Sequence, residues 1–216
     1  MTIYTDNILF IHIPKTAGTS VINEIKKSRT VYHVANDRTK NDNYHSTAKD
    51  CFTSVPQIQK LYKFTIVRNP WDRACSWYFF RKKIVEKEIN RLKVGKKSKK
   101  LANNLQDLKL EMLFLNSGFN DWLSKYIYST WDFTWFSLSH DQHTWLDGIE
   151  LDKIFKFENL YEELKSIDVL NLSNLKHMRK SLNNKNDFRL IYNKDSIDLI
   201  EKIYKKDIKK FGFKFE

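Results

Sequence analysis

Short apolar runs recur along this chain, separated by longer stretches with polar turns or helical periodicity. Four runs have the length of buried strands and are too short for core helices, and they cover residues 8–13, 31–34, 64–67 and 154–157. Buried strands that alternate with helices form parallel sheets covered on both faces. The pattern therefore predicts an α/β fold in which helices flank a central, mostly parallel sheet.

Length and composition fit one such fold. The chain has 216 residues, of which 41% are hydrophobic, and it shows no internal repeat or low-complexity linker. This is enough to bury one sizeable core. We predict a single domain over residues 1–216, with a helix-rich region at about residues 81–150.

The C-terminal part has the clearest helical pattern. Apolar side chains keep a helical spacing at Ile197, Ile200, Ile203, Ile208 and Phe211. Asp195 lies near the start of this pattern and Gly212 at its end, as is typical of helix termini. We predict one helix between them.

Two of the predicted strands end in residues suited to phosphate. The first strand is followed by Pro14, Lys15, Thr16, Ala17, Gly18, Thr19 and Ser20. Pro14 ends the strand and Gly18 permits a tight turn, after which backbone N–H groups and the positive end of a helix dipole favour an anion. Thr19 stands where a Walker loop has lysine, so the Walker motif is absent. The alternative is an ordinary turn and a helix capped by Thr19 and Ser20.

The second strand end carries an arginine and a serine. Arg68 ends the strand, and Ser76 follows it by eight residues. Pro70 and Trp71 begin a helix between them. An arginine fork and a hydroxyl at this spacing can bind a second phosphate, which suggests a nucleotide with phosphates at both ends. The alternative is that Arg68 pairs with Asp72 and Ser76 lies on the helix surface.

These two segments resemble the sulfotransferases that use 3′-phosphoadenosine 5′-phosphosulfate (PAPS). Residues 13–20 are similar to their 5′-phosphosulfate loop, and residues 67–73 with Ser76 are similar to their 3′-phosphate motif. The choice of residues resembles the type 2 branch that contains the carbohydrate sulfotransferases and heparan sulfate 2-O-sulfotransferase. Weaker similarity continues in residues 44–49, 142–146, 155–160 and 204–213. The resemblance implies the P-loop-like, three-layer fold of PAPS sulfotransferases.

The resemblance also implies roles for individual residues. Residues 14–20 would surround the 5′-phosphosulfate, and Arg68 and Ser76 would hold the 3′-phosphate. His45 would be the general base, because histidine has an ordinary pKa of about 6.5 and suits proton transfer. Lys15 and the N–H groups after it would stabilise charge on the leaving 3′-phosphoadenosine 5′-phosphate (PAP). No metal takes part in this scheme.

His45 has an alternative interpretation as a surface residue. It precedes Ser46, a candidate N-cap for a helix starting at Thr47. We favour the base, because His45 lies in a segment that resembles the family.

The other histidines are weaker candidates. His12 and His33 lie in predicted strands, and we expect them to pack there. His140 and His143 flank Gln142, and the residue before this glutamine is Asp, where the family pattern has proline. Their roles stay open.

Positive charge is concentrated in residues 81–100. Ten Lys/Arg and two Glu give this segment +8 of the formal net charge of +12. One interpretation is a solvated helix end and loop. The other is a basic rim that attracts an anionic acceptor such as an acidic or sulfated glycan. Aromatic residues in the stretch 122–135 suit core packing, and some of them suit an acceptor cleft.

Other features limit the class of protein. Cys51 and Cys75 are isolated and no cluster has zinc-like spacing, so we predict no disulfide framework and no metal site. No apolar stretch reaches the roughly 18 residues of a membrane span. Asp6 and Asn7 precede the only early apolar run, which argues against a secretory signal. We expect a soluble, cytoplasmic enzyme.

The leading prediction is transfer of a sulfuryl group from PAPS to a hydroxyl of a carbohydrate or related acceptor. A P-loop kinase is the first alternative, although it would need magnesium and the missing Walker lysine. A basic nucleic-acid-binding protein is the second. Against it, residues 81–100 contain no aromatic side chain to stack on bases, and no RNA- or DNA-recognition signature is present.

Overall fold

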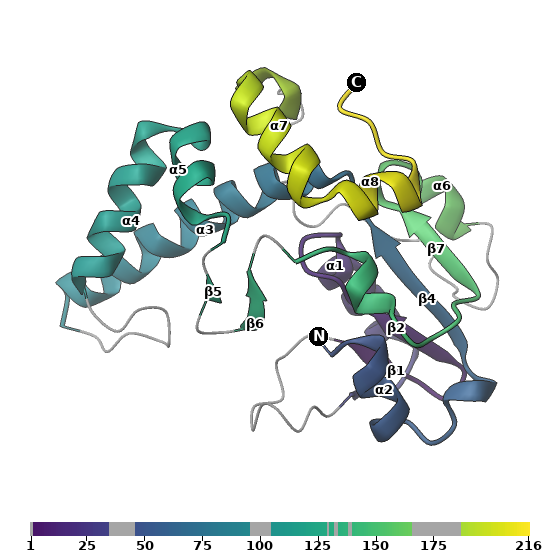
Figure 1. Cartoon of the computed structure of the whole chain (residues 1–216). Helices are drawn as coiled ribbons and strands as arrows, with labels where there is room; N and C mark the ends of the chain where they lie inside the picture. Colours follow the sequence, from purple (N-terminus) through teal and green to yellow (C-terminus); the bar gives the residue numbers. More distant parts are fainter. Residues whose placement is uncertain are drawn as a thin grey trace. The chain divides into compact units, whose positions relative to one another are not determined.

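The structure is a computed structural model that describes residues 2–34, 46–95, 105–128, 130–131, 134–137, 140–165 and 187–216 (Figure 1). The chain divides into two compact units. The first comprises Met1–Asn69 and Asp141–Lys180, and the second comprises Pro70–His140 and Ser181–Glu216. A single domain over the whole chain stays a prediction, and each unit is described by itself.

The first unit contains a mostly parallel sheet. Its strands lie in the order β3-β1-β2-β4-β7, and they are β1 (Ile3–Tyr4), β2 (Ile8–Ile11), β3 (Tyr32–His33), β4 (Tyr62–Val67) and β7 (Lys153–Lys156). The pairs β2/β4 and β4/β7 are parallel, whereas β1 runs antiparallel to β2 and β3. The predicted α/β class and mostly parallel sheet are confirmed. Sequence reasoning missed β1, because two residues show no periodicity.

Helices alternate with the strands of this sheet along the chain. They are α1 (Gly18–Ser28), α2 (Ala48–Ser54), α6 (Leu160–Lys165) and the short 3₁₀ helices η1 (Ile58–Lys60), η2 (His143–Leu146) and η3 (Phe157–Asn159). Ile8 and Phe10 of β2 share one core cluster with Val21 of α1 and Leu160 of α6. Successive strand residues point to opposite faces. Leu9, which faces the other way, is also fully buried, so both faces of the sheet are covered.

The second unit is mainly helical. Its described elements are α3 (Pro70–Lys93), α4 (Leu105–Ser117), α5 (Phe119–Tyr126), the antiparallel pair β5 (Thr130–Trp131) and β6 (Thr134–Ser137), η5 (Phe188–Ile191), α7 (Lys194–Ile203) and α8 (Lys205–Phe211). The prediction of one C-terminal helix is wrong, because Tyr204 separates α7 from α8. The step from Ile203 to Ile208 spans five residues, more than one helical turn, and marks this break. Gly212 lies at the C-terminal end of the helical segment, as predicted, and it has the left-handed conformation.

Two stretches with alternative interpretations, the basic segment and the aromatic stretch, contribute buried side chains to the second unit. Arg81, the first residue of the basic segment, is 3% exposed and donates to both carboxylate oxygens of Glu111, at 2.8 and 2.6 Å. It joins α3 to α4 and is no rim cation. Trp122 is fully buried, with its ring 5.5 Å from that of Tyr78, which confirms core packing for this aromatic. Residues 96–100 and the side chains of residues 129–135 lie outside the described part.

Across the described ranges, no helix has both the length and the apolar character needed to cross a membrane.

Candidate functional site

The ends of β2 and β4 lie next to each other in the sheet. The two strands are parallel neighbours, and Ile11 of β2 pairs with Thr65 of β4. The Thr65 hydroxyl donates to the carbonyl of Ile11 at 2.7 Å, which adds a side-chain bond to this pairing. Ligands of such sheets bind beyond the carboxyl ends of the strands. The loop after β2 and Arg68 after β4 both follow these carboxyl ends.

The loop after β2 has an unusual backbone. Lys15 and Ala17 have φ angles of 70° and 71°, in the left-handed region. For residues with a Cβ atom this conformation costs roughly 1–2 kcal/mol each. Thr16, between them, is fully buried, and its hydroxyl donates to the carbonyl of Ile13 at 2.8 Å. Such strain persists where surrounding structure fixes it, and it is concentrated at ligand sites.

Helix α1 begins without a side-chain cap. Its N-cap is Ala17, and no side chain accepts a hydrogen bond there. The alternative in which Thr19 and Ser20 cap this helix is therefore wrong. The Ser20 N–H donates to the Ala17 carbonyl at 2.9 Å. A left-handed residue followed by a helical one turns successive N–H groups toward one side, and this arrangement binds anions.

Gly18 allows α1 to begin directly against a buried histidine. A Cβ atom at position 18 would overlap the imidazole of His12. This imidazole is stacked on Phe10 with ring centroids 5.7 Å apart, and His12 is 6% exposed. The expectation that His12 packs is confirmed. Its contact with Gly18 went unpredicted, although the spacing of six residues across a tight turn is visible in the sequence.

Arg68 is held through both its backbone and its side chain. Its N–H donates to Oε1 of Gln142 at 2.9 Å, and Nε2 of Gln142 donates to its carbonyl at 2.8 Å. The guanidinium carbon lies 4.0 Å from the ring centroid of Phe157, and Nη1 donates to the carbonyl of Lys15 at 3.1 Å. Arg68 is 8% exposed. The arginine thus connects the end of β4 to the loop after β2.

The residue after Arg68 is anchored by an acidic side chain. The N–H of Asn69 donates to Oε1 of Glu158 at 2.8 Å. Glu158 and Phe157 lie in η3, directly after β7. Sequence reasoning assigned no role to either residue, because their partners are far away in the chain.

Ser76 belongs to the second unit, in the second turn of α3. It is 1% exposed, so the alternative in which it is a helix-surface residue is wrong. Its contact with a 3′-phosphate stays a prediction.

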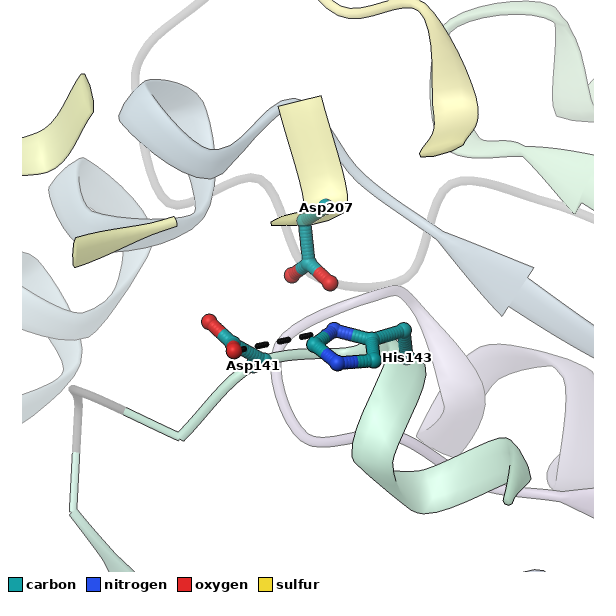
Figure 2. Close-up of side chains that lie close together, drawn as sticks. All are labelled: Asp141, His143 and Asp207. Atoms are coloured by element: carbon teal, nitrogen blue, oxygen red, sulfur yellow. Dashed lines mark ion pairs between the residues drawn. The ribbon is translucent and has the colours of Figure 1, made fainter. Parts of the chain in front are cut away.

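The histidines differ in environment. His45, the predicted base, lies outside the described residues. His33 is exposed on β3, so the expectation that it packs is wrong. His143 lies in η2, and its Nδ1 is 3.6 Å from a carboxylate oxygen of Asp141 (Figure 2). In the second unit, the carbonyl of His140 accepts a hydrogen bond from Arg73 at 3.0 Å.

The helix after His45 begins one residue later than predicted. Thr47 is the N-cap, and its hydroxyl accepts from the Asp50 N–H at 3.3 Å while the Asp50 carboxylate accepts from the Thr47 N–H at 2.6 Å. This reciprocal arrangement is a capping box. The Ser46 hydroxyl instead donates to the Val34 carbonyl at 3.2 Å.

Both cysteines are buried thiols without a disulfide, as predicted. Burial, together with the negative charge of Asp50, raises the pKa of Cys51 to about 12. The Cys51 thiol therefore stays protonated at neutral pH and is a poor nucleophile.

A comparison with protein-family models matches residues 1–214 to the model described as the sulfotransferase family. The chain belongs to the sulfotransferase family. No match was found among curated proteins or among solved structures. Sulfotransferases transfer a sulfuryl group to an acceptor hydroxyl, and the family generally uses PAPS and releases PAP. In this sulfotransferase, the strained loop and Arg68 lie where the α/β fold places its ligands.

Proposed function

We propose that the chain transfers the sulfuryl group of PAPS to a hydroxyl of a carbohydrate or related acceptor and releases PAP. The observation that carries this proposal is the end of β2. There, a left-handed backbone at Lys15 and Ala17 leads into a helix that no side chain caps. Such a helix end suits the dianionic end of a nucleotide.

The loop residues 14–20 would hold the 5′-phosphosulfate. The backbone N–H groups at the start of α1 would donate to its oxygens, with Thr19 and Ser20 adding hydroxyls. A hydroxyl has one proton to donate, and that of Thr16 is bonded to Ile13. Thr16 would therefore contact the donor through its backbone. Lys15, which is half-buried, would place its ammonium near the bridging oxygen.

Arg68 and Ser76 would hold the 3′-phosphate, as the family motif implies. A guanidinium binds phosphate through a planar fork of N–H donors. The stacking of Arg68 on Phe157 supports its role, because it restricts the plane of this fork. The contribution of Ser76 rests on the motif.

The transfer would proceed in line. The acceptor oxygen forms a bond to sulfur as the bond between sulfur and the 5′-phosphate oxygen breaks, and the leaving group is PAP. His45 would take the proton of the acceptor hydroxyl. Lys15 and the N–H groups of α1 would stabilise the negative charge that develops on PAP. No step requires a metal.

The acceptor would be a glycan, in keeping with the resemblance to the carbohydrate and heparan sulfate 2-O-sulfotransferases. Exposed lysines of the basic segment, Lys83, Lys87 and Lys93 of α3, would attract an anionic acceptor. A cytoplasmic location is part of the same proposal.

The proposal is tested by transfer of labelled sulfuryl from PAPS to a panel of glycans, beside transfer of the γ-phosphate of ATP to the same panel. We expect sulfated product with PAPS and none in the His45→Ala variant, whose affinity for PAP should remain near that of wild type. Phosphorylated product from ATP would favour a kinase instead. If His45→Ala retains turnover, the base lies elsewhere, and His143, paired with Asp141, is the next residue to replace.

A further inference from the structure

Arg68 has left the sheet, so its backbone groups need partners other than a neighbouring strand. Strand β4 ends at Val67, and the last residue pair between β4 and β7 is Val67 with Lys156. The side chain of Gln142 takes over at Arg68. It accepts from the N–H at 2.9 Å and donates to the carbonyl at 2.8 Å, as the peptide group of another strand would.

Gln142 is itself firmly placed. It is fully buried and is the N-cap residue of η2, where its carbonyl accepts from the Trp145 N–H at 3.2 Å. Trp145 and Leu146 are 4% and 5% exposed, so two large apolar side chains of this short helix are buried. An amide held in this way transmits a fixed position to the residue that it binds.

Because Gln142 fixes the Arg68 backbone, it also limits the directions in which the Arg68 side chain can point. From there the guanidinium reaches both the face of Phe157, at 4.0 Å, and the carbonyl of Lys15, at 3.1 Å. A planar fork recognises phosphate only within a narrow range of positions, and a misplacement of 1 Å is costly. Loss of the clamp would shift the fork without removing it.

We propose that Gln142 is a positioning residue that sets the preference of this site for a nucleotide carrying a 3′-phosphate. It acts through Arg68 and does not contact the nucleotide. The inference deepens the proposed function and rests on its assignment of Arg68. A merely structural role, in which Gln142 only satisfies buried backbone groups, would lower stability without changing this preference.

The test uses two ligands that differ only in the 3′-phosphate. Calorimetry measures the affinities of the full chain for PAP and for AMP, in wild type and in the Gln142→Met variant, which keeps the side-chain length and removes both hydrogen bonds. We expect the ratio of the two affinities to fall by about tenfold in Gln142→Met, in line with the weakening of one charge-assisted hydrogen bond. The affinity for AMP should stay within about twofold of wild type.

Thr65→Val is the matched control. It removes a buried hydrogen bond from the same strand, that of the Thr65 hydroxyl to the Ile11 carbonyl, without touching Arg68. This variant should lose thermal stability and keep the wild-type ratio. If Gln142→Met fails to fold, Gln142→Asn is judged by the same criterion, because it adds no charge and its amide is one methylene too short to bind both backbone groups of Arg68 in the present geometry.

The possible results distinguish a failure of the positioning role of Gln142 from a failure of the assignment of Arg68 to the 3′-phosphate. Suppose that Arg68→Ala loses the preference for PAP over AMP, and that the folded Gln142 variant keeps the wild-type ratio of the two affinities. This result overturns the positioning role of Gln142 and leaves the assignment of Arg68 intact. If wild type binds PAP no better than AMP, or if Arg68→Ala keeps the preference, the assignment of Arg68 fails and the inference fails with it.

Discussion

The ends of β2 and β4 lead into the two proposed phosphate sites, and they are held in different ways. The loop after β2 is held mostly by contacts within itself, in addition to the bond from the Arg68 side chain to the Lys15 carbonyl. Lys15 and Ala17 adopt left-handed φ angles, the Thr16 hydroxyl binds the Ile13 carbonyl, and Gly18 lies against His12. All of the contacts within the loop join residues within six positions of each other.

The end of β4 depends on residues that are distant in the chain. Gln142, which binds the Arg68 backbone, is 74 residues away, and Glu158, which binds Asn69, is 89 residues away. The first site is therefore a local motif, whereas the second depends on tertiary structure. Nucleotide binding at the first site should therefore depend on residues of the loop after β2 itself. Binding at the second site should also depend on residues that are distant in the chain.

The largest effect is expected at Lys15, the charged residue of the local motif. Lys15→Ala should lower turnover by about 100- to 1,000-fold, because it removes a cation that stabilises the leaving group. Sulfuryl transfer from PAPS at saturating donor measures this loss. Lys15→Gly should lose the same activity while unfolding at a higher temperature than Lys15→Ala, since glycine adopts a φ of 70° without strain. Wild-type turnover in both variants would remove Lys15 from the mechanism.

The next largest effect is expected at Gly18, and it shows whether local packing fixes the loop after β2. Gly18→Ala should weaken PAP binding by about 100-fold, because the new methyl group displaces either the start of α1 or the imidazole of His12. The double variant His12→Ala with Gly18→Ala should regain part of this affinity, since the smaller side chain leaves room. Calorimetry on Gly18→Ala, on His12→Ala and on the double variant measures the coupling.

A matched glycine provides the control. Gly95 also has a positive φ, of 72°, but a methyl group there would meet nothing within 4 Å. Gly95→Ala should cost about 1 kcal/mol in stability from backbone strain and leave PAP affinity unchanged. An unaltered affinity in Gly18→Ala would contradict the tight contact with His12.

A smaller and more selective effect is expected at the end of β4. Arg68→Ala should weaken PAP binding by about 10- to 100-fold and AMP binding by much less, because only PAP carries the 3′-phosphate that the fork would bind, and the bond from Arg68 to the Lys15 carbonyl is one of several that hold the loop after β2. Arg68→Lys keeps the charge and loses the fork, so it should recover only part of the affinity. Equal losses for both ligands would reject this assignment.

The smallest effect is expected at the opposite end of β4. Contacts there should contribute to the stability of the strand and not to nucleotide binding. The Lys63 N–H donates to the Asp152 carboxylate at 2.7 Å, and the Lys63 ammonium lies 3.2 Å from the same oxygen. Partial burial raises the pKa of Asp152, but these hydrogen bonds and the Lys63 charge outweigh it and lower the pKa below the ordinary value. A lowered pKa means that the stabilisation is present above the ordinary carboxyl pKa and is lost as the pH falls through the folded-state value.

Asp152→Asn should therefore lower the free energy of unfolding at pH 7 by about 0.2–1 kcal/mol, a small amount because solvent screens this partly exposed pair. The difference from wild type should shrink as the pH falls below about 4. Urea unfolding at pH 7 and pH 3 measures both values. A changed PAP affinity in this variant would show that the two ends of β4 are not independent.

The same contrast explains how much of the molecule could be predicted from its sequence. The strands of the parallel core and the loop after β2 were accessible, because apolar runs, Pro14 and Gly18 are local signals. The left-handed Ala17 and the missing cap at α1 were not, since alanine gives no sign of that conformation. The clamp of Gln142 on Arg68 needed the tertiary structure, as no local pattern pairs an amide with a backbone 74 residues away. The break at Tyr204 was signalled only by a five-residue step in an otherwise helical pattern.

The two strand ends are proposed to form the donor site of a PAPS-dependent enzyme. The first measurement is calorimetric titration of the wild-type chain, at moderate salt, with PAP and separately with ATP and magnesium. We expect selective binding of PAP, without a requirement for magnesium. A preference for magnesium ATP, or no binding of either nucleotide, would contradict it.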